Sequence, residues 1–165
     1  IMLGETPVVA AVAGWAVGGA FSWPMNCDLS VWETGARGFF PELAHGLFVS
    51  GGMTFLLPHW AGGPAANDIL YSGDRYDAET LHRMGLVSRV AEPGQGRAAA
   101  KALADRIAGY SAAARAAMKR TVIGGFRPAL AREVDALMEV MVAGDWRDRT
   151  ATNFPAAKSG NKTGE

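Results

Sequence analysis

Two adjacent glycines after a short apolar run are the first residues whose types and spacing could do chemistry. Gly18 and Gly19 lie between a β-branched run at residues 7–12, typical of a buried strand, and a helix-like stretch at residues 20–26. Because glycine lacks a Cβ atom, such a turn lets the backbone approach a ligand and present N–H groups at a helix N-terminus. These donors can stabilise negative charge developing on a carbonyl oxygen. A Gly-Gly turn alone, however, is more often purely structural.

These glycines do not predict a dinucleotide site. Together with Gly14, their positions do not match the G-x-G-x-x-G fingerprint of nucleotide-binding turns. A second glycine-rich segment, Ser50-Gly51-Gly52, indicates either a nest for phosphate or acyl groups or an ordinary turn.

Glu42 is the carboxylate best placed for acid–base chemistry. It follows the rigid Pro41 in a glycine- and aromatic-rich region that could remove it from water and raise its pKa. The structural alternative is a glutamate at a helix start, stabilised there by the helix dipole. His45 lies one helical turn later and could face the same cavity, although histidines of this kind are more often surface or core residues. From the residues alone, the structural alternative is favoured.

No metal site and no disulfide are predicted. The three histidines, His45, His59 and His82, have no ligand spacing with one another. The single cysteine, Cys27, cannot form a disulfide within the chain and is interpreted as a small buried apolar residue. A chain without disulfides is typical of a reducing compartment, so we expect the protein to be cytoplasmic.

The charge pattern argues against nucleic-acid and membrane partners. The chain has 16 basic and 16 acidic side chains, whereas binding to phosphate backbones needs a basic surface. Residues 6–27 carry no charge and would be long enough to span a bilayer. Pro7, Pro24 and Asn26 interrupt this stretch, and no basic residue flanks it before Arg37. It is therefore interpreted as a buried strand followed by a buried helix.

The elements expected around these residues make an α/β chain. Strands are predicted at residues 8–12, 29–32 and 86–90, and helices at 20–26, 54–60, 66–71 and 78–84. Residues 37–53 are expected to form loops around one short helical turn at residues 42–45. Further helices follow residue 93, with Phe126-Arg127-Pro128 separating two of them.

The predicted organisation has three parts. Residues 1–92 form a partial core that contains the glycine and glutamate motifs, residues 93–155 form a helical region, and residues 156–165 form a flexible tail. The sheet has few predicted strands and the first one starts the chain almost at once, so we expect further strands to precede Ile1. An apolar stripe late in the chain is more surface than one small domain covers, which predicts self-association. The stripe comprises Leu130, Val134, Leu137, Met138 and Met141.

Five ordered motifs resemble those of the enoyl-CoA hydratase/isomerase (crotonase) family. Residues 6–19, TPVVAAVAGWAVGG, resemble the family signature with the pattern P-V-I-A-A-V-N-G-x-A-x-G-G-G. The other four are Cys27-Asp28-Leu29, Phe40-Pro41-Glu42-Leu43, Tyr71-Ser72-Gly73-Asp74 and Met84-Gly85-Leu86-Val87, and together with the signature they cover most of the chain at family spacing.

This resemblance implies a crotonase-like ββα-superhelix, truncated at its N-terminus, with a C-terminal helical trimerisation region. It implies an acyl-CoA thioester as substrate, no cofactor besides the coenzyme A of that substrate, and self-association as a trimer or hexamer. By motif position, Gly19 supplies the second of two backbone N–H groups that polarise the thioester carbonyl. The first donor normally comes from an earlier loop that is not in this sequence.

The resemblance also assigns the proton chemistry, with one departure from the family pattern. Glu42 matches one of two carboxylates used by the family's hydratases, but Ser22 occupies the position of the other. A single glutamate favours isomerase-like proton shuttling on an enoyl-CoA, with Gly18, Ser22, Pro41 and Ser50 contacting the substrate. One alternative is a hydratase that uses Glu42 and a water near Ser22. Another is a non-catalytic member that binds acyl-CoA or assembles with other subunits.

Overall fold

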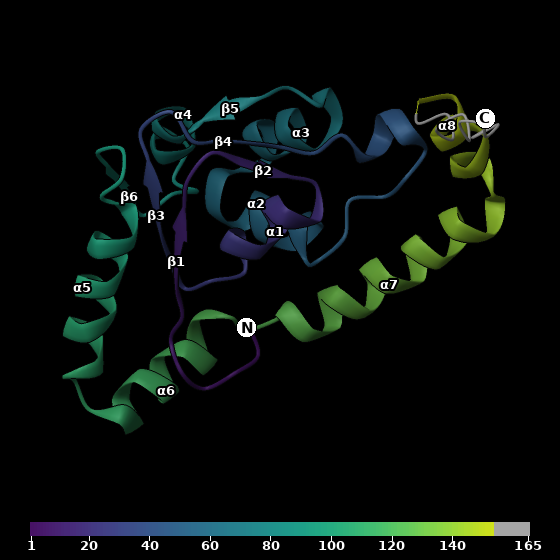
Figure 1. Cartoon of the computed structure of the whole chain (residues 1–165). Coiled ribbons are helices and arrows are strands. Elements are labelled where there is room, and N and C mark those ends of the chain that lie inside the picture. The colour runs from purple at the N-terminus through teal and green to yellow at the C-terminus, as the bar shows by residue number, and fades with distance from the viewer. Residues whose placement is uncertain (154–165) are drawn as a thin grey trace, which may run out of the picture.

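The computed structural model describes residues 1–153 and places short strands first and long helices last (Figure 1). The strands are β1 (Val9–Val12), β2 (Trp15–Val17), β3 (Leu29–Glu33), β4 (Arg37–Phe39), β5 (Tyr76–Asp77) and β6 (Arg89–Ala91). The helices are α1 (Gly19–Met25), the 3₁₀ turn η1 (Glu42–His45), α2 (Met53–Ala61), α3 (Gly63–Ser72), α4 (Ala78–Arg83), α5 (Gly96–Ala108), α6 (Ala112–Val122), α7 (Phe126–Ala143) and α8 (Asp145–Asn153). The predicted tail at residues 156–165 lies outside the described residues.

One sheet consists of three parallel strands in the order β1–β3–β6. Val9 pairs with Leu29 and Val12 with Trp32, as expected for apolar strands covered by helices. The centre of β3 is fully buried at Val31 and Trp32, and α5 packs against β1 and β3. The predicted strands at residues 8–12 and 29–32 are therefore confirmed, each to within one residue at its ends.

A second sheet, in the order β2–β4–β5, was missed in the sequence. No strand was predicted at residues 15–17, and residues 37–39 were expected to be part of a loop, but β2 and β4 pair in parallel and β5 joins them antiparallel. Both strands are three residues long, and β4 contains Gly38, so neither shows a β pattern. Gly38 is needed because a Cβ atom there would lie 2.5 Å from the Phe21 ring.

Two further boundaries were predicted wrongly. The expected strand at residues 86–90 is β6 at Arg89–Ala91, since Leu86 and Val87 are buried in the core without pairing in the sheet. Residues 126–128 do not separate helices but form the first turn of α7, where proline is tolerated because the N–H that it lacks would have no acceptor within the helix. The break lies at Gly124 and at Gly125, which has a φ of +86°.

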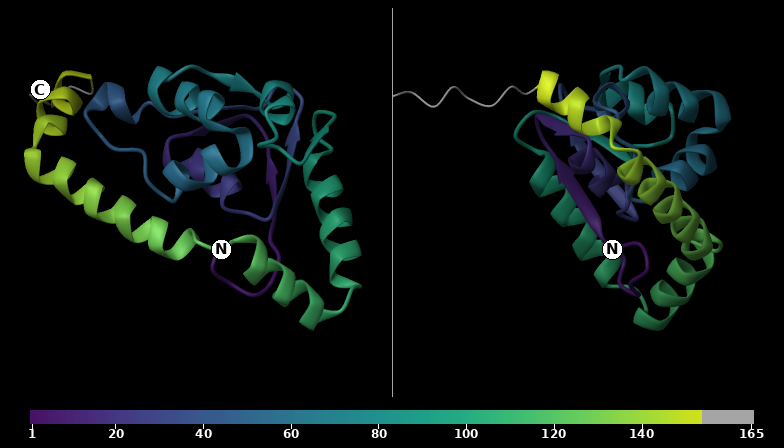
Figure 2. Two further views of the ribbon diagram at one scale, coloured as in Figure 1. Left: turned by 180° about the vertical axis from the view of Figure 1, so that it is seen from behind. Right: turned by 90° about the vertical axis from the view of Figure 1, so that its right-hand side faces the viewer.

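The helices divide into those that build the core and those that extend from it. Helices α1 to α4 surround the rings of Phe21, Trp32 and Phe40, which contact each other edge-on or tilted. Helices α6 and α7 run along one side of this body, and α8 returns to pack against η1 (Figures 1 and 2). Within residues 1–153, no helix is long and apolar enough to cross a membrane.

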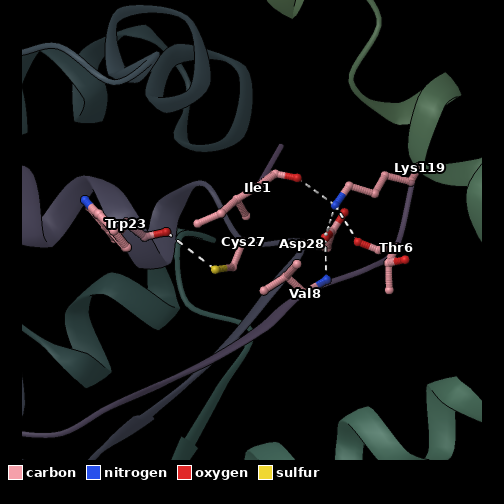
Figure 3. A network of polar contacts seen from close by, with 7 residues as sticks. All are labelled: Ile1, Thr6, Val8, Trp23, Cys27, Asp28 and Lys119. Carbon is pink, nitrogen blue, oxygen red and sulfur yellow. Dashed lines mark hydrogen bonds and ion pairs between the residues drawn. The ribbon is translucent and has the colours of Figure 1, made fainter. Parts of the chain in front are cut away.

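A buried ion pair fastens α6 to the start of the chain (Figure 3). Lys119 Nζ lies 2.8 Å from Asp28 Oδ2 and donates to the carbonyl oxygens of Ile1 and Thr6. The same Asp28 oxygen accepts from the Val8 N–H at 2.7 Å. This cluster joins three segments that are distant in sequence: the N-terminal residues, the start of β3 and the C-terminal helices.

Candidate functional site

The turn from β2 into α1 has the geometry expected of an N–H donor site. Gly18 is the N-cap of α1, with φ +56° and ψ −126°, a conformation that disfavours any side chain. The N–H groups of Phe21 and Ser22 donate to the Gly18 carbonyl oxygen. The first two N–H groups of α1, including that of Gly19, therefore have no acceptor within the helix. A Cβ atom at Gly19 would meet nothing within 4 Å, so the turn is open on this side.

Glu42 brings its carboxylate directly against this turn. A Cβ atom at Gly18 would lie 2.6 Å from Glu42 Oε1 and 3.4 Å from its Cδ. Only a glycine at position 18 therefore lets the carboxylate reach this position. Glu42 begins the turn η1, which was predicted at the same residues, and its N-cap is Pro41. The structure thus joins two motifs that are separated by more than twenty residues in the sequence.

The surroundings of Glu42 favour its protonated form. The residue is half-buried, and its Oε2 atom is buried without a hydrogen-bond partner among the described residues. Burial raises the pKa of Glu42 above its ordinary value of 4.5, while its own backbone N–H and the nearby His45 act in the opposite direction. A carboxyl group with a raised pKa exchanges protons closer to neutral pH, as acid–base catalysis requires.

The raised pKa of Glu42 makes stability depend on pH. Between the ordinary pKa of 4.5 and the higher pKa in the fold, the folded state binds a proton that the unfolded state has released. We expect the free energy of unfolding to fall as pH rises through this interval, and Glu42→Gln to remove that component. Urea unfolding of both proteins from about pH 4 to about pH 8 measures the difference. Parallel pH profiles for the two proteins would contradict the expectation.

A cavity of about 400 Å³ opens beside the same turn. Its lining includes three predicted site residues, Gly19, Ser22 and Ser50, and apolar side chains that include Trp23 and Leu130. Ser22 is buried, and its hydroxyl donates to the Ser50 carbonyl oxygen at 3.4 Å. The loop at Ser50 is therefore in contact with α1, as a substrate-binding role would require.

The other predicted residues lie at the edge of this arrangement. Gly18, Pro41 and Glu42 do not line the cavity, and Glu42 reaches the site through its contact with Gly18. Sequence reasoning missed Asn26, whose amide donates to the carbonyl oxygens of Ser22 at 2.9 Å and Gly51 at 2.7 Å. A polar side chain in an otherwise apolar stretch of sequence is the feature that could have identified Asn26 as a site residue.

Sequence reasoning also missed α7 as part of the site. Phe126 and Leu130 line the cavity from α7, although a hundred residues or more separate them from α1. No local pattern could reveal this, because Phe126 was expected to lie between two helices and Leu130 in the apolar stripe of the later one.

A larger cavity lies away from these residues. It measures about 470 Å³, is mainly apolar and is lined by residues of α2 and α6, including Phe55, Trp60 and Met118. None of the predicted site residues lines it. Its larger size alone therefore does not make it the functional site.

Residues 1–153 contain no group of three or more His, Cys, Asp and Glu side chains that could hold a metal ion. His82 instead pairs through Nδ1 with the Val87 carbonyl oxygen at 2.7 Å, and His59 stacks on the Phe55 ring. Cys27 is buried, and this burial raises the pKa of its thiol.

The sequence matches proteins named as enoyl-CoA hydratases over much of its length. The family model for enoyl-CoA hydratase/isomerase matches residues 1–147. The chain is 31% identical to the short-chain-enoyl-CoA hydratase of Clostridium acetobutylicum over 148 residues, covering 87% of this chain and 57% of the relative. It is 36% identical to the crotonyl-CoA hydratase of Syntrophomonas wolfei over 103 residues, covering 62% and 40%. The chain thus spans about half the length of these relatives.

The fold matches solved structures equally well. A crystal structure of an enoyl-CoA hydratase/isomerase from Pseudoalteromonas atlantica superposes with a TM-score of 0.84 at 28% identity, covering 91% of this chain and 62% of that one. A carnitinyl-CoA dehydratase from Mycobacterium avium also gives a TM-score of 0.84, at 26% identity, covering 93% and 63%. The predicted crotonase-like α/β fold with C-terminal helices is confirmed. The chain belongs to the enoyl-CoA hydratase/isomerase family.

Proposed function

We propose that the native protein moves a proton on an enoyl-CoA thioester through an enolate. The Gly19 N–H stabilises the negative charge on the thioester oxygen, and Glu42 removes and returns the proton at the acyl chain. The observation that carries this proposal is the contact of the Glu42 carboxylate with Gly18, which brings a proton acceptor against the residue that precedes the Gly19 N–H. Gly18, Ser22, Pro41 and Ser50 form the substrate-binding surroundings, and the only coenzyme is the CoA of the substrate.

The single glutamate supports isomerase-like chemistry. His45 is the one charged side chain that acts on the pKa of Glu42, and no second carboxylate among the described residues does so. At the position of the hydratases' other carboxylate, Ser22 directs its hydroxyl to the Ser50 carbonyl oxygen. A serine in this role is not a general base at neutral pH without an activating partner. Moving one proton between two carbons needs only one such group.

A hydratase is the second candidate, and the relatives favour it. The short-chain-enoyl-CoA hydratase and the crotonyl-CoA hydratase described above are both named for water addition. Ser22 lines the 400 Å³ cavity, so its hydroxyl could hold a water for Glu42 to activate. A third candidate is a non-catalytic acyl-CoA-binding subunit, for which the site would retain Gly19 but not proton transfer.

One experiment separates these three functions. The native protein is incubated in D₂O with a trans-2-enoyl-CoA and, separately, with a cis-3-enoyl-CoA, and the products are followed by NMR. Interconversion of the two thioesters with deuterium incorporation supports the isomerase. Formation of 3-hydroxyacyl-CoA from the 2-enoyl substrate supports the hydratase instead. Quenching of tryptophan fluorescence without turnover indicates a binding subunit, and the absence of both turnover reactions and of quenching overturns all three functions.

We also propose that the protein acts in the cytoplasm as a trimer or hexamer. Three apolar side chains spaced one turn apart on α7 are exposed: Val134 at 49%, Met138 at 56% and Val142 at 81%. Exposed apolar faces of this kind are typical of subunit interfaces.

We therefore expect light scattering at micromolar concentration to report more than one subunit. Met138→Glu should shift the mass toward the monomer, because it places a charge in the apolar face. Glu139→Gln, at the next and exposed position of α7, is the matched control and should leave the mass unchanged. A wild-type protein that scatters as a monomer would end this proposal.

A further inference from the structure

Glu133 makes a contact from α7 that neither the motifs nor the proposed chemistry uses. The residue is 4% exposed, and its carboxylate accepts hydrogen bonds from the Gly52 N–H at 2.5 Å and the Thr54 N–H at 3.1 Å. The Thr54 hydroxyl also donates to it at 2.6 Å. Helix α2 starts at Met53, and its N-cap Gly52 has no side chain to cap it. A side chain of α7 therefore caps α2.

The loop before α2 is held from its other side by α1. The Ser50 carbonyl oxygen accepts from the Ser22 hydroxyl, and the Gly51 carbonyl oxygen accepts from the Asn26 amide at 2.7 Å. Gly51 and Gly52 have φ values of +82° and +84°, so the loop adopts a backbone that is readily accessible only to glycine. Such a loop is flexible on its own and depends on outside contacts for one conformation. These contacts come from α1 on one side and from Glu133 on the other.

This loop is one wall of the candidate substrate cavity. Ser50 and Gly51 line the cavity together with Gly19 of α1, and Phe126 and Leu130 line it from α7. Glu133 follows Leu130 by three residues, so it lies on the same side of α7 and next along the same helix. One helix thus contributes part of the wall and also fixes the loop that forms another part.

We propose that Glu133 is a positioning residue for the acyl-CoA site: by holding the Gly52 and Thr54 amides it fixes the loop at residues 50–52 as a substrate-facing wall. This inference rests on the proposed function for the identity of the ligand. The tether, meaning the hydrogen bonds from Gly52 and Thr54 to the Glu133 carboxylate, does not depend on that function. It assigns part of the C-terminal helical region to the substrate site as well as to subunit assembly.

The tether is tested first without any substrate. In Glu133→Ala, the Gly52 and Thr54 amides lose their acceptor, so we expect their hydrogen exchange to speed up by about tenfold or more. Glu133→Gln keeps one acceptor oxygen and should give an intermediate rate. Glu139→Ala removes an exposed glutamate from the same helix and should leave these amides unchanged. If exchange at both amides stays within about twofold of wild type in Glu133→Ala, the tether is overturned.

The link to the site is tested with butanoyl-CoA as the probe. Binding is measured by calorimetry at a temperature where circular dichroism shows each variant to be folded. We expect the dissociation constant to rise about tenfold in Glu133→Ala and less in Glu133→Gln, because the loop must be ordered on binding. A purely structural cap would lower the unfolding temperature but leave the dissociation constant of the folded protein unchanged, and that result would overturn the proposal.

One outcome distinguishes a failure of this proposal from a failure of the proposed function. If the wild-type protein does not bind butanoyl-CoA while the amides respond as expected, the proposed ligand is wrong and the tether stands. If Glu133→Ala does not fold, Thr54→Val replaces it, since this change removes only the hydroxyl bond to Glu133. Thr54→Val should then accelerate exchange at Gly52 and weaken probe binding in the same direction by a smaller factor. No change in either measurement would overturn the proposal.

Discussion

Glu42→Gln is expected to lower turnover of the enoyl-CoA substrate by about 10²–10⁴-fold while leaving its binding within a few-fold of wild type. The amide keeps the size of the side chain and its place against Gly18 but cannot accept the substrate proton. The loss should appear in kcat rather than in KM, because Glu42 acts on the reacting atoms and not on the coenzyme. Initial rates on trans-2- and cis-3-enoyl-CoA, with the dissociation constant measured separately, provide the check.

Ser22→Ala is the matched comparison because Ser22 occupies the other carboxylate position. An isomerase with one working glutamate should tolerate this change within about tenfold. A serine that positions the reacting water should not, since losing one polar contact costs about 1–3 kcal/mol. Near-normal turnover in Glu42→Gln would place the proton chemistry on another residue. A collapse of water addition in Ser22→Ala, with Glu42 also essential, would favour the hydratase.

The candidate site residues that lie within a motif could be predicted from the sequence. The contact that the fold makes between the two motifs could not. Gly19 and Glu42 were identified from their motifs, and the structure then brought Glu42 against Gly18. This contact depends on η1 folding back over the β2–α1 turn, which no local pattern encodes. The Gly18 N–H donates to the Phe39 carbonyl oxygen at 2.9 Å, and this bond joins the turn to the end of β4. Strand β4 itself was missed.

Helices and strands were predicted well where their own sequence carries an apolar period or a capping residue. They were predicted poorly where contacts with residues distant in the sequence determine the structure. The helix predicted at residues 78–84 is α4, and the Asp77 side chain caps it by accepting from the Thr80 N–H at 2.8 Å. Helix α7 was expected to begin after Pro128, because proline usually breaks helices. In the first turn of a helix, however, proline costs no intrahelical hydrogen bond. Glu133 was not singled out, since a buried glutamate that caps another helix looks in sequence like any solvated glutamate.

Lys119→Met is expected to destabilise the protein by about 3 kcal/mol or more. The Lys119 side chain is 1% exposed and that of Asp28 20%, so the remaining carboxylate would be largely buried with only the Val8 N–H as partner. The carbonyl oxygens of Ile1 and Thr6 would also lose their donor. Urea unfolding at constant pH measures the change. The control is Lys101→Met, whose pair with Asp105 is exposed and should contribute less than about 1 kcal/mol.

Adding Asp28→Asn to Lys119→Met should restore part of the lost stability. An asparagine at this position removes the unpaired charge, and its side-chain oxygen can still accept from the Val8 N–H that now binds Asp28 at 2.7 Å. Most of the penalty in Lys119→Met comes from burying one charge without its partner, so neutralising that charge should recover part of this penalty. The double variant should therefore be more stable than Lys119→Met alone. If it is less stable, the Asp28 carboxylate stabilises the fold through its hydrogen bond from the Val8 N–H even without the lysine, and burial of the unpaired charge is not the main penalty.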